Sequence, residues 1–199
     1  MIMKEFLIAS NNRHKVVELN RILNPLGIKA VTPKECGVDL GDVEETGTTF
    51  AENAEIKAMS AYKKTSMPTV ADDSGLMVDA LDGRPGVYSA RYAGENASDK
   101  DRFTKLLDEM KDVPENKRTA HFVSSICCIL DDKTIIKVEG TVEGKIAYAP
   151  KGEDGFGYDP VFITQSGKTF AQLSSEEKDA ISHRGNALRK LKEEIEKYI

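Results

Sequence analysis

Apolar residues near the start of the chain form one short block followed by a spaced pattern. The block covers residues 5–9 (EFLIA) and is typical of a buried strand. The spaced pattern has the period of a helix face and consists of Val16, Leu19, Ile22, Leu23 and Leu26. Asn12 is a suitable N-cap for this helix, and residues 25–27 (Pro-Leu-Gly) mark its end. The pattern predicts a strand, a polar loop and a helix, an arrangement that commonly binds ligands at the loop.

Two further amphipathic segments predict helices. The first covers residues 49–64, after a loop that carries Glu44 and Glu45, and its core-facing positions are Phe50, Ala54, Met59 and Ala61. Asn53 and Lys57 lie four residues apart and share another face of this helix. Ser98 and Asp101 form a capping box for the second. Its apolar stripe is Phe103, Leu106, Leu107 and Met110.

The middle of the chain is rich in β-forming residues. A short strand is predicted at residues 69–71, and residues 118–130 and 134–142 predict a hairpin. A short strand at residues 161–164 precedes a helical end whose apolar side is Ala187, Leu188, Leu191 and Ile195. The order of these elements predicts a mixed α/β protein.

The composition is that of one globular domain. The chain has 199 residues, of which 40% are hydrophobic and 31% charged, and such a length buries a full core. Lys and Arg number 28 against 33 Asp and Glu, so the formal net charge is −5. We therefore expect neither a nucleic-acid partner nor an anionic membrane partner. An anionic ligand would have to meet cations that are gathered locally.

The three cysteines and the N-terminus indicate a cytoplasmic protein. Cys36, Cys127 and Cys128 fit neither a disulfide framework nor a zinc site. Cys127 and Cys128 lie in an apolar run that predicts a buried strand. The first residues lack the features of a signal peptide, and no segment approaches the ~20 apolar residues of a membrane span.

The first polar cluster lies at the start of the first predicted helix. Ser10, Asn12 and Lys15 bring a hydroxyl, an amide and an ammonium group to a helix N-terminus, where free N–H groups attract phosphate. A capped helix with a solvated lysine fits the same residues, and the spacing alone leaves both interpretations open.

The second cluster is acidic. Asp72 and Asp73 follow the predicted strand at residues 69–71 and are considered together with Glu44 and Glu45. Carboxylate oxygens suit Mg²⁺, and strand alternation would turn only one of the two aspartates toward a ligand. A surface turn with solvated carboxylates is the other interpretation.

The third cluster is the Gly-rich segment at residues 155–160 (GFGYDP). Its glycines let the backbone approach a flat ligand, and Phe156 could stack on a base. A tight turn with the ring in the core fits equally well. Further on, Lys178, His183 and Arg184 place three potential cations close together.

The three clusters together fit a nucleoside triphosphate site. They supply carboxylates for a metal, cations for phosphate oxygens, and an aromatic ring with donors for a base. The chain has neither a P-loop nor a dinucleotide fingerprint, which disfavours ordinary ATPases, kinases and dinucleotide enzymes.

Five segments, in order along nearly the whole chain, resemble the inosine/xanthosine triphosphate pyrophosphatase family. They are residues 10–15 (SNNRHK), 44–58 (EETGTTFAENAEIKA), 71–94 (ADDSGLMVDALDGRPGVYSARYAG), 155–162 (GFGYDPVF) and 176–188 (EEKDAISHRGNAL). The resemblance implies hydrolysis of ITP, dITP or XTP to the nucleoside monophosphate and pyrophosphate, with Mg²⁺ as cofactor, in a homodimer. It also implies one domain over residues 1–199, with an elongated mixed β-sheet, flanking helices and two lobes around a central cleft.

The resemblance also assigns roles to individual residues. Glu44 and Asp73 match the metal-associated carboxylates, with Asp73 also the proton acceptor for the attacking water, and Ser74 matches a substrate contact beside them. The segment that resembles the phosphate-cradling loop is Ser10, Asn11, Asn12, Arg13, His14 and Lys15. The segment that resembles the base-holding loop is Phe156, Gly157, Tyr158 and Asp159. The remaining matched substrate contacts are Lys178, His183 and Arg184.

Physical chemistry is compatible with these roles. A triphosphate carries about four negative charges, so Mg²⁺ and several cations are needed before water can approach the α-phosphorus. Donors near His183 and Arg184 would meet the 6-oxo group of hypoxanthine or xanthine, whereas the amino group of adenine would leave them unpaired. The alternatives are a Maf-like nucleotide pyrophosphatase with another base preference and a nucleotide-binding module without catalysis.

Overall fold

The computed structural model describes residues 4–10 and 12–198, and the chain divides into two compact units. The first unit comprises Met1–Asp73, Ser124–Gly140 and Arg184–Ile199. The second unit comprises Ser74–Val123 and Thr141–His183. The predicted cleft between two lobes stays a prediction.

The strands form one mixed sheet in the order β2-β1-β3-β4-β5-β6. They are β1 (Lys4–Ile8), β2 (Ile28–Val31), β3 (Thr69–Val78), β4 (Thr119–Asp131), β5 (Thr134–Ile146) and β6 (Phe162–Ile163). Strand β1 pairs in parallel with both β2 and β3, whereas β5 pairs antiparallel with β6. The predicted mixed α/β fold is confirmed.

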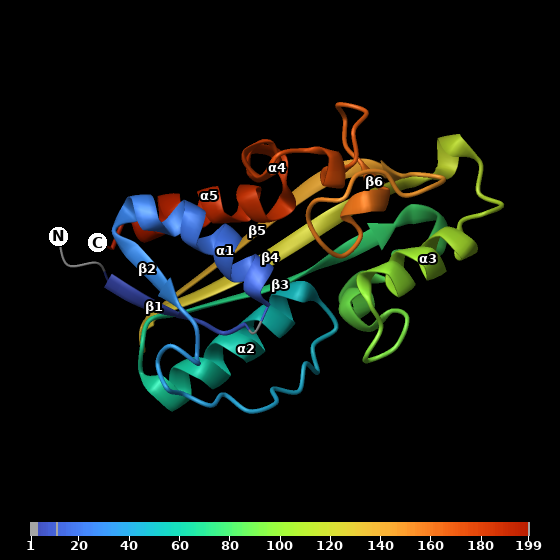
Figure 1. Cartoon of the computed structure of the whole chain (residues 1–199). Helices are drawn as coiled ribbons and strands as arrows, with labels where there is room; N and C mark the ends of the chain where they lie inside the picture. The colour runs from blue at the N-terminus through green and yellow to red at the C-terminus, as the bar shows by residue number, and fades with distance from the viewer. Residues whose placement is uncertain (1–3, 11, 199) are drawn as a thin grey trace. The chain divides into compact units, whose positions relative to one another are not determined.

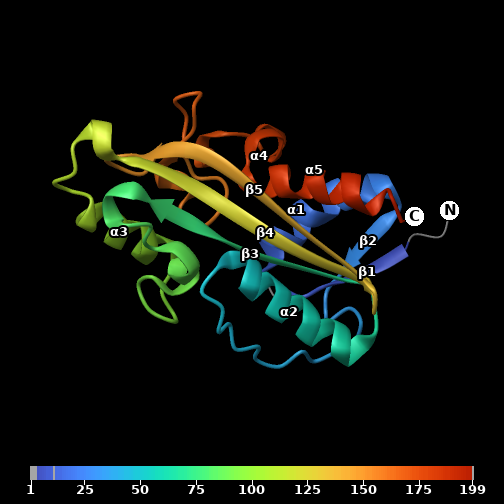
Figure 2. The same ribbon diagram turned by 180° about the vertical axis from the view of Figure 1, so that it is seen from behind.

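Helices cover both faces of the sheet in the first unit (Figure 1). Helices α1 (Arg13–Leu23) and α5 (His183–Ile195) lie on one face and α2 (Phe50–Thr65) on the other, as the reverse view in Figure 2 also shows. Side-chain alternation along β1 serves both layers, because Phe6 packs in the cluster of α1 and α5 while Leu7 packs in the cluster of α2. The first unit therefore has a core on each face of its part of the sheet.

The helix starts follow from local side-chain caps. Asn12 Oδ1 accepts hydrogen bonds from the backbone N–H groups of His14 at 3.0 Å and Lys15 at 3.3 Å, which confirms the predicted N-cap. Thr49 and Glu52 form a complete capping box at the start of α2. The predicted starts of both helices are confirmed to within a residue.

The strand that carries the two aspartates is longer than predicted. The expectation of a strand that ends at residue 71 and leaves Asp72 and Asp73 in a loop is wrong, because β3 continues to Val78. Leu76 and Val78 are fully buried in the core of the second unit, and their burial stabilises the continuation of the strand. The two acids remain within it because basic side chains pair with them. The short strand β2 was not predicted.

The second unit has its own aromatic core. Helix α3 (Asp99–Glu109) begins with the predicted capping box of Ser98 and Asp101, and α4 (Ser175–Ile181) follows β6. The rings of Phe122 and Phe162 meet edge to face with centroids 4.7 Å apart, and Phe170 packs beside them. The same core contains Tyr158 of the Gly-rich segment and Val161, which directly follows that segment.

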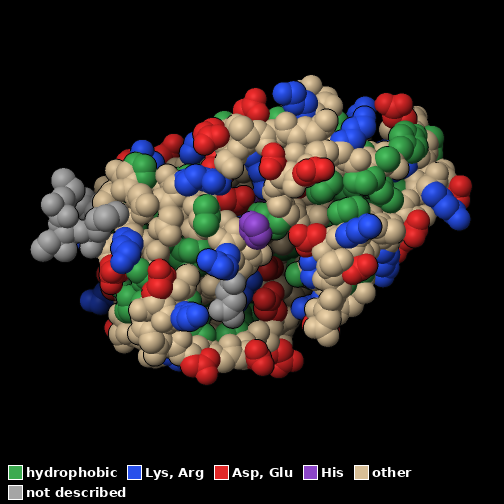
Figure 3. Space-filling model, viewed as in Figure 1, with side chains coloured by type: hydrophobic (Ala, Val, Ile, Leu, Met, Phe, Trp, Pro, Cys, Tyr) green, Lys and Arg blue, Asp and Glu red, His purple; other side chains and the backbone are tan. Residues whose placement is uncertain are grey.

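The remaining expectations concern thiols, membranes and surface charge. Cys127 and Cys128 are buried in β4 as predicted, and burial raises the pKa of Cys127 to about 11. Among the described residues, no helix has the length and apolar character that a membrane span requires. On the face drawn in Figure 3, Lys and Arg side chains are interspersed with Asp and Glu.

Candidate active site

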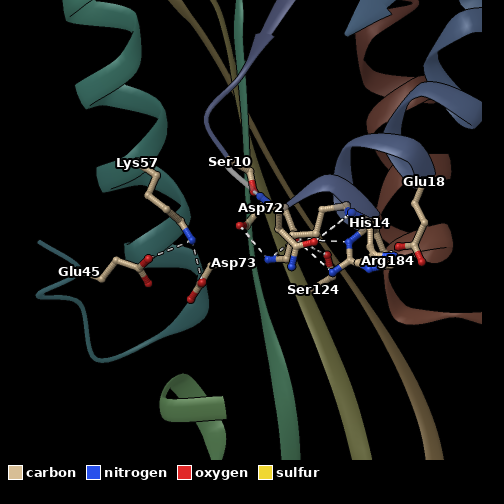
Figure 4. A network of polar contacts seen from close by, with 11 residues as sticks. Ser10, His14, Glu18, Glu45, Lys57, Asp72, Asp73, Ser124 and Arg184 are labelled. Atoms are coloured by element: carbon tan, nitrogen blue, oxygen red, sulfur yellow. Dashed lines mark hydrogen bonds and ion pairs between the residues drawn. The ribbon is translucent and has the colours of Figure 1, made fainter. Parts of the chain in front are cut away.

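Strand alternation divides the polar residues of the first unit into two groups. Asp72 and Asp73 are neighbours on β3 and turn their carboxylates to opposite sides (Figure 4). Asp72 meets Lys15 from α1 and Arg184 from α5, whereas Asp73 meets Lys57 from α2. The prediction that the two aspartates point in opposite directions is confirmed.

Asp72 is the centre of a buried chain of charges. Its Oδ2 lies 2.8 Å from Lys15 Nζ and 3.2 Å from Arg184 Nη2, and Ser124 Oγ donates to its Oδ1 at 2.5 Å. Arg184 Nη1 also donates to Glu18, a buried residue of α1. The groups alternate in sign along the row Lys15, Asp72, Arg184 and Glu18.

The alternation of charge keeps Asp72 ionised. Burial alone would raise the pKa of Asp72, but Arg184 and Lys15 outweigh it and hold the pKa below its ordinary value. The pKa of Lys15 is lowered. Burial is the main cause, and the nearby cations Arg184 and Lys57 add to it, so that together they outweigh the attraction of Asp72. Lys15 is half-buried, and its ammonium group is directed at Asp72.

Arg184 lies in the interior and is held by carboxylates. Only 2% of the residue is exposed, and its guanidinium donates to both Asp72 and Glu18. Burial would lower the pKa of Arg184, but the two carboxylates outweigh burial and raise it. The visible role of Arg184 is to orient Asp72, and through it Lys15. Its predicted contact with substrate stays a prediction.

Asp73 has one oxygen paired and one buried oxygen without a partner among the described residues. Lys57 Nζ donates to Asp73 Oδ1 at 2.8 Å, and Oδ2 accepts no hydrogen bond from them. Burial raises the pKa of Asp73 above its ordinary value, against the attraction of Lys57 and Lys15. A buried, unpaired carboxylate oxygen is a natural acceptor for a proton or a cation.

Lys57 is a site residue that the sequence predictions did not include. Its ammonium group pairs with Asp73 and also lies 3.5 Å from Glu45 Oε1. Burial would lower the pKa of Lys57, but Asp73 and Glu45 outweigh it and raise the pKa. The signals in the sequence were that Lys57 shares a helix face with Asn53 and lies within the resembling segment at residues 44–58.

The loop that carries Glu44 and Glu45 brings Glu45 close to Lys57 and Asp73. Glu45 is half-buried beside Lys57, whereas its neighbour Glu44 has an exposed side chain. The structure therefore joins Glu45 to Lys57 and Asp73, and the metal role of Glu44 stays a prediction.

In the predicted phosphate loop at residues 10–15, only some of the described side chains point toward the buried aspartates of β3. Ser10 Oγ accepts from the backbone N–H of Asn12 at 3.1 Å, and Asn12 caps α1. Arg13 and His14 are exposed at the helix start, while Lys15 turns inward to Asp72. Asn11 lies outside the described residues.

In the second unit, Asp159 holds the Gly-rich segment together. Its Oδ2 accepts from the backbone N–H of Phe156 at 2.9 Å and from Lys178 Nζ at 2.7 Å. The Lys178 ammonium also lies 4.7 Å from the centre of the Phe156 ring. The predicted residues Phe156, Asp159 and Lys178 therefore form one cluster.

Three other residues predicted to contact substrate lie in the second unit, where the structure shows their burial and neighbours. Tyr158 is buried and its hydroxyl donates to the Ser89 carbonyl at 2.8 Å. His183 is buried with its ring stacked on Phe122 at 4.6 Å between centroids. Ser74 is half-buried on β3.

The carboxylates of the first unit fit a magnesium ion. No group of three or more His, Cys, Asp or Glu among the described residues could hold a metal. Mg²⁺ is usually bound by one or two carboxylates together with water and substrate phosphates. The unpaired Asp73 Oδ2, with Glu45 nearby on Lys57, is compatible with that mode of binding.

Comparison with known proteins assigns the chain to a family. Residues 6–194 match the family model described as the Ham1 family. The chain belongs to the Ham1 family. Among curated relatives of this Ham1 chain, the dITP/XTP pyrophosphatase of Geobacillus kaustophilus is 48% identical and covers 99% of this chain and 97% of its own length. The dITP/XTP pyrophosphatase of Bacillus subtilis is 47% identical, and the match covers 98% of this chain and 99% of the relative's own length.

Solved Ham1 structures have the same fold. The Ham1 protein from Coxiella burnetii superposes with a TM-score of 0.88 at 43% identity, covering 98% of this chain and 100% of that one. A structure titled nucleoside-triphosphatase / dITP/XTP pyrophosphatase from Mycobacterium abscessus superposes with a TM-score of 0.76 at 43% identity, covering 94% and 98%. The resemblance noted from the sequence motifs is confirmed.

Proposed function

We propose that this Ham1 family protein hydrolyses dITP, XTP and ITP to the nucleoside monophosphate and pyrophosphate. One structural observation carries the proposal. Adjacent aspartates of β3 hold two different lysines, and the second aspartate keeps a buried oxygen unpaired among the described residues. The near-full-length similarity to dITP/XTP pyrophosphatases supports the choice of substrate, and it does not favour the Maf-like or the non-catalytic alternative.

Asp73 is the proton acceptor in this proposal. Lys57 holds Oδ1 and so fixes the direction of the carboxylate, while Oδ2 is buried and has no hydrogen-bond partner among the described residues. The raised pKa of Asp73 moves it toward the range in which a carboxylate accepts a proton effectively. The water would attack the α-phosphorus after losing its proton to Oδ2.

Phosphate oxygens are assigned to Lys15 and the start of α1. Lys15 is held in place by Asp72, and the first N–H groups of α1 carry partial positive charge. Because Asp72 itself is fixed by Arg184 and Ser124, the ammonium has little freedom to move away. Such preorganised cations stabilise the charge that develops on the phosphates.

Mg²⁺ is the proposed cofactor. Asp73 and Glu45 would hold it, together with Glu44 as the family resemblance implies. When bound, Mg²⁺ would neutralise phosphate charge and make the α-phosphorus more electrophilic.

Recognition of the base is assigned to the second unit. Phe156 offers a ring for stacking, and the Lys178 ammonium beside it is a donor for a 6-oxo group. Adenine carries an amino group at that position, so its donor would face another donor. An unpaired buried donor discriminates strongly between such bases.

A substrate panel tests this proposal. The protein is incubated with dITP, XTP, ITP, ATP and GTP in Mg²⁺, and the released phosphate is identified as pyrophosphate or orthophosphate. We expect pyrophosphate, with kcat/KM for the first three at least about 100-fold above that for ATP. We also expect that chelation by EDTA abolishes the activity and that Mg²⁺ restores it. Release of orthophosphate, or equal kcat/KM for ATP and ITP, would contradict the proposal.

We further propose a cytoplasmic homodimer. The three free cysteines are compatible with a reducing compartment. The exposed aromatic side chains of Tyr88 and Tyr148 are compatible with contact surface between copies. Light scattering coupled to gel filtration should give twice the chain mass of 21.9 kDa.

A further inference from the structure

A long irregular segment carries the acidic residues of the site. Residues 32–49 connect β2 to α2 and contain no helix or strand. Segments of this kind are usually mobile, because few buried contacts hold them. Glu45 nevertheless meets Lys57, so some contact must fix the backbone close to Glu45.

Asn53 supplies that contact. It is 1% exposed, and its Oδ1 accepts a hydrogen bond from the backbone N–H of Gly47 at 2.8 Å. Asparagine is unfavourable inside a helix because its side chain competes for backbone groups. Here the side chain bonds to the loop instead, two residues beyond Glu45.

Gly47 is packed too closely against α2 for any other residue. A Cβ atom at Gly47 would lie 2.6 Å from Asn53 Oδ1 and 2.7 Å from Glu52 Cβ. The missing side chain therefore allows the backbone to reach Asn53.

Glu52 holds the next residues of the loop in the same way. Its Oε2 accepts from the backbone N–H of Thr48 at 2.7 Å and of Thr49 at 3.2 Å. The backbone of residues 47–49 is thus attached to the first turn of α2 by two neighbouring side chains. We call Asn53, Glu52 and Gly47 the loop clamp.

The loop clamp and the reacting groups share one helix. Asn53 and Lys57 are four residues apart on α2 and so lie on the same face. Asn53 holds the backbone of the loop, while Lys57 pairs with both Glu45 and Asp73. Neighbouring positions of α2 therefore carry both the contact with the loop and the lysine that bridges Glu45 and Asp73.

We propose that Asn53 is a positioning residue, which acts through Gly47 to hold Glu45 beside Lys57 and Asp73. This inference rests on the proposed function, because it assigns a role in the same reaction. It goes beyond that proposal by naming the group that keeps the proposed Mg²⁺ ligands together before substrate binds.

Two variants and one control test the proposal. Asn53→Leu roughly keeps the volume of the side chain and removes the acceptor. Gly47→Ala changes the loop instead, because the added Cβ atom would collide with Asn53 and Glu52 and push the loop away from α2. Thr65→Ala is the control, since Thr65 Oγ1 donates to Ala61 and accepts from the backbone N–H of Met67 at the end of α2 opposite to residues 47–49. Each protein is compared by amide hydrogen exchange without ligands, by kcat and KM for dITP, and by its Mg²⁺ requirement.

We expect amide exchange of residues 47–49 to be at least tenfold faster in both variants. The Mg²⁺ concentration for half-maximal rate should rise at least fivefold, and kcat/KM should fall at least tenfold. The double variant should lose no more activity than the worse single variant, because both changes break one contact. Thr65→Ala should stay within twofold of the parent in all three measurements.

Three results would overturn the proposal. They are unchanged exchange at residues 47–49, faster exchange with an unchanged Mg²⁺ requirement and kcat/KM, and full additivity in the double variant. If Asn53→Leu does not fold, Gly47→Ala carries the same test from the loop side. A parent protein that releases no pyrophosphate from dITP contradicts the proposed function, whereas the exchange data still report on the clamp.

Discussion

Two adjacent carboxylates on one strand have opposite electrostatic surroundings. Burial acts against the charge of both, but Arg184 and Lys15 outweigh burial at Asp72, whereas Lys57 does not outweigh it at Asp73. The pKa of Asp72 is therefore lowered and that of Asp73 is raised. Pairs of acids whose surroundings separate their pKa values often divide roles in catalysis. Here Asp72 orients a cation, and Asp73 keeps a buried oxygen that has no hydrogen-bond partner among the described residues.

Replacement of Asp73 by asparagine tests its assigned role. Asp73→Asn keeps the shape of the side chain but cannot take a proton from water. At saturating Mg²⁺ we expect kcat for dITP to fall by about 10²–10⁴-fold, the usual contribution of a general base. Asp108→Asn, a change at an exposed position of α3, is the matched control and should leave kcat unchanged. Near-normal turnover of the Asp73 variant would contradict the assignment.

Removal of Arg184 tests the buried charge row. In Arg184→Met the carboxylates of Asp72 and Glu18 lose their shared partner while they stay buried. We expect the free energy of unfolding to fall by about 3–5 kcal/mol, measured by urea denaturation. Lys192→Met removes an exposed pair 3.9 Å from Glu196 and should cost only about 0–1 kcal/mol. Equal losses in the two variants would contradict the role of Arg184.

At the scale of elements, the Gly-rich segment is held at three successive points. Asp159 accepts from the Phe156 backbone, Asp99 accepts from the Gly157 backbone at 2.8 Å, and the Tyr158 hydroxyl bonds to Ser89. Asp159 lies within the segment, whereas the side chain of Asp99 and the carbonyl of Ser89 belong to other parts of the second unit. The segment is therefore a fixed platform for Phe156.

Gly155 is required by this arrangement. Its φ of +80° already favours glycine, and a Cβ atom there would lie 2.1 Å from Asp159 Oδ2. In Gly155→Ala the carboxylate must leave its bonds to Phe156 and Lys178, so we expect KM for dITP to rise at least about tenfold, or 1.4 kcal/mol.

Gly167→Ala separates this effect from backbone strain. Gly167 has nearly the same φ of +82°, and a Cβ atom there would meet nothing within 4 Å. Both variants should lose a similar ~1–2 kcal/mol of stability from the left-handed backbone. Steady-state kinetics should show a raised KM in the Gly155 variant only, and a similar KM in both would contradict the argument.

At the scale of the whole molecule, the cations of the candidate site are paired with carboxylates in each of the two units. The formal net charge is −5. Lys15, Lys57, Lys178 and Arg184 each pair with at least one carboxylate. Such paired cations can meet a small anion locally, but they provide little attraction for a long polyanion.

Weak binding to DNA is therefore expected. Fluorescence anisotropy with a labelled duplex at physiological salt should show a Kd no tighter than about 100 µM, the weak end of non-specific binding. A Kd near 1 µM that weakens steeply with added salt would contradict this expectation.

Much of the local structure could be predicted because it depends on short-range interactions. Asn12 caps α1 and Ser98 pairs with Asp101 through contacts within three residues, and the helix faces follow from apolar spacing. The residue types of the candidate site were also visible in the motifs. The end of β3 could not be predicted from the sequence, because its buried continuation depends on contacts with distant parts of the chain.

The partners of the charged groups were decided by the tertiary structure. Arg184 binds Asp72 and Glu18, which lie 112 and 166 residues away in the sequence, and Lys57, which pairs with Asp73, was not among the predicted site residues. The sequence by itself determined which carboxylates and cations were available, and where helices would start. The tertiary structure decided which of them meet, because packing α1, α2 and α5 on opposite faces of β3 sorts the charges by strand alternation.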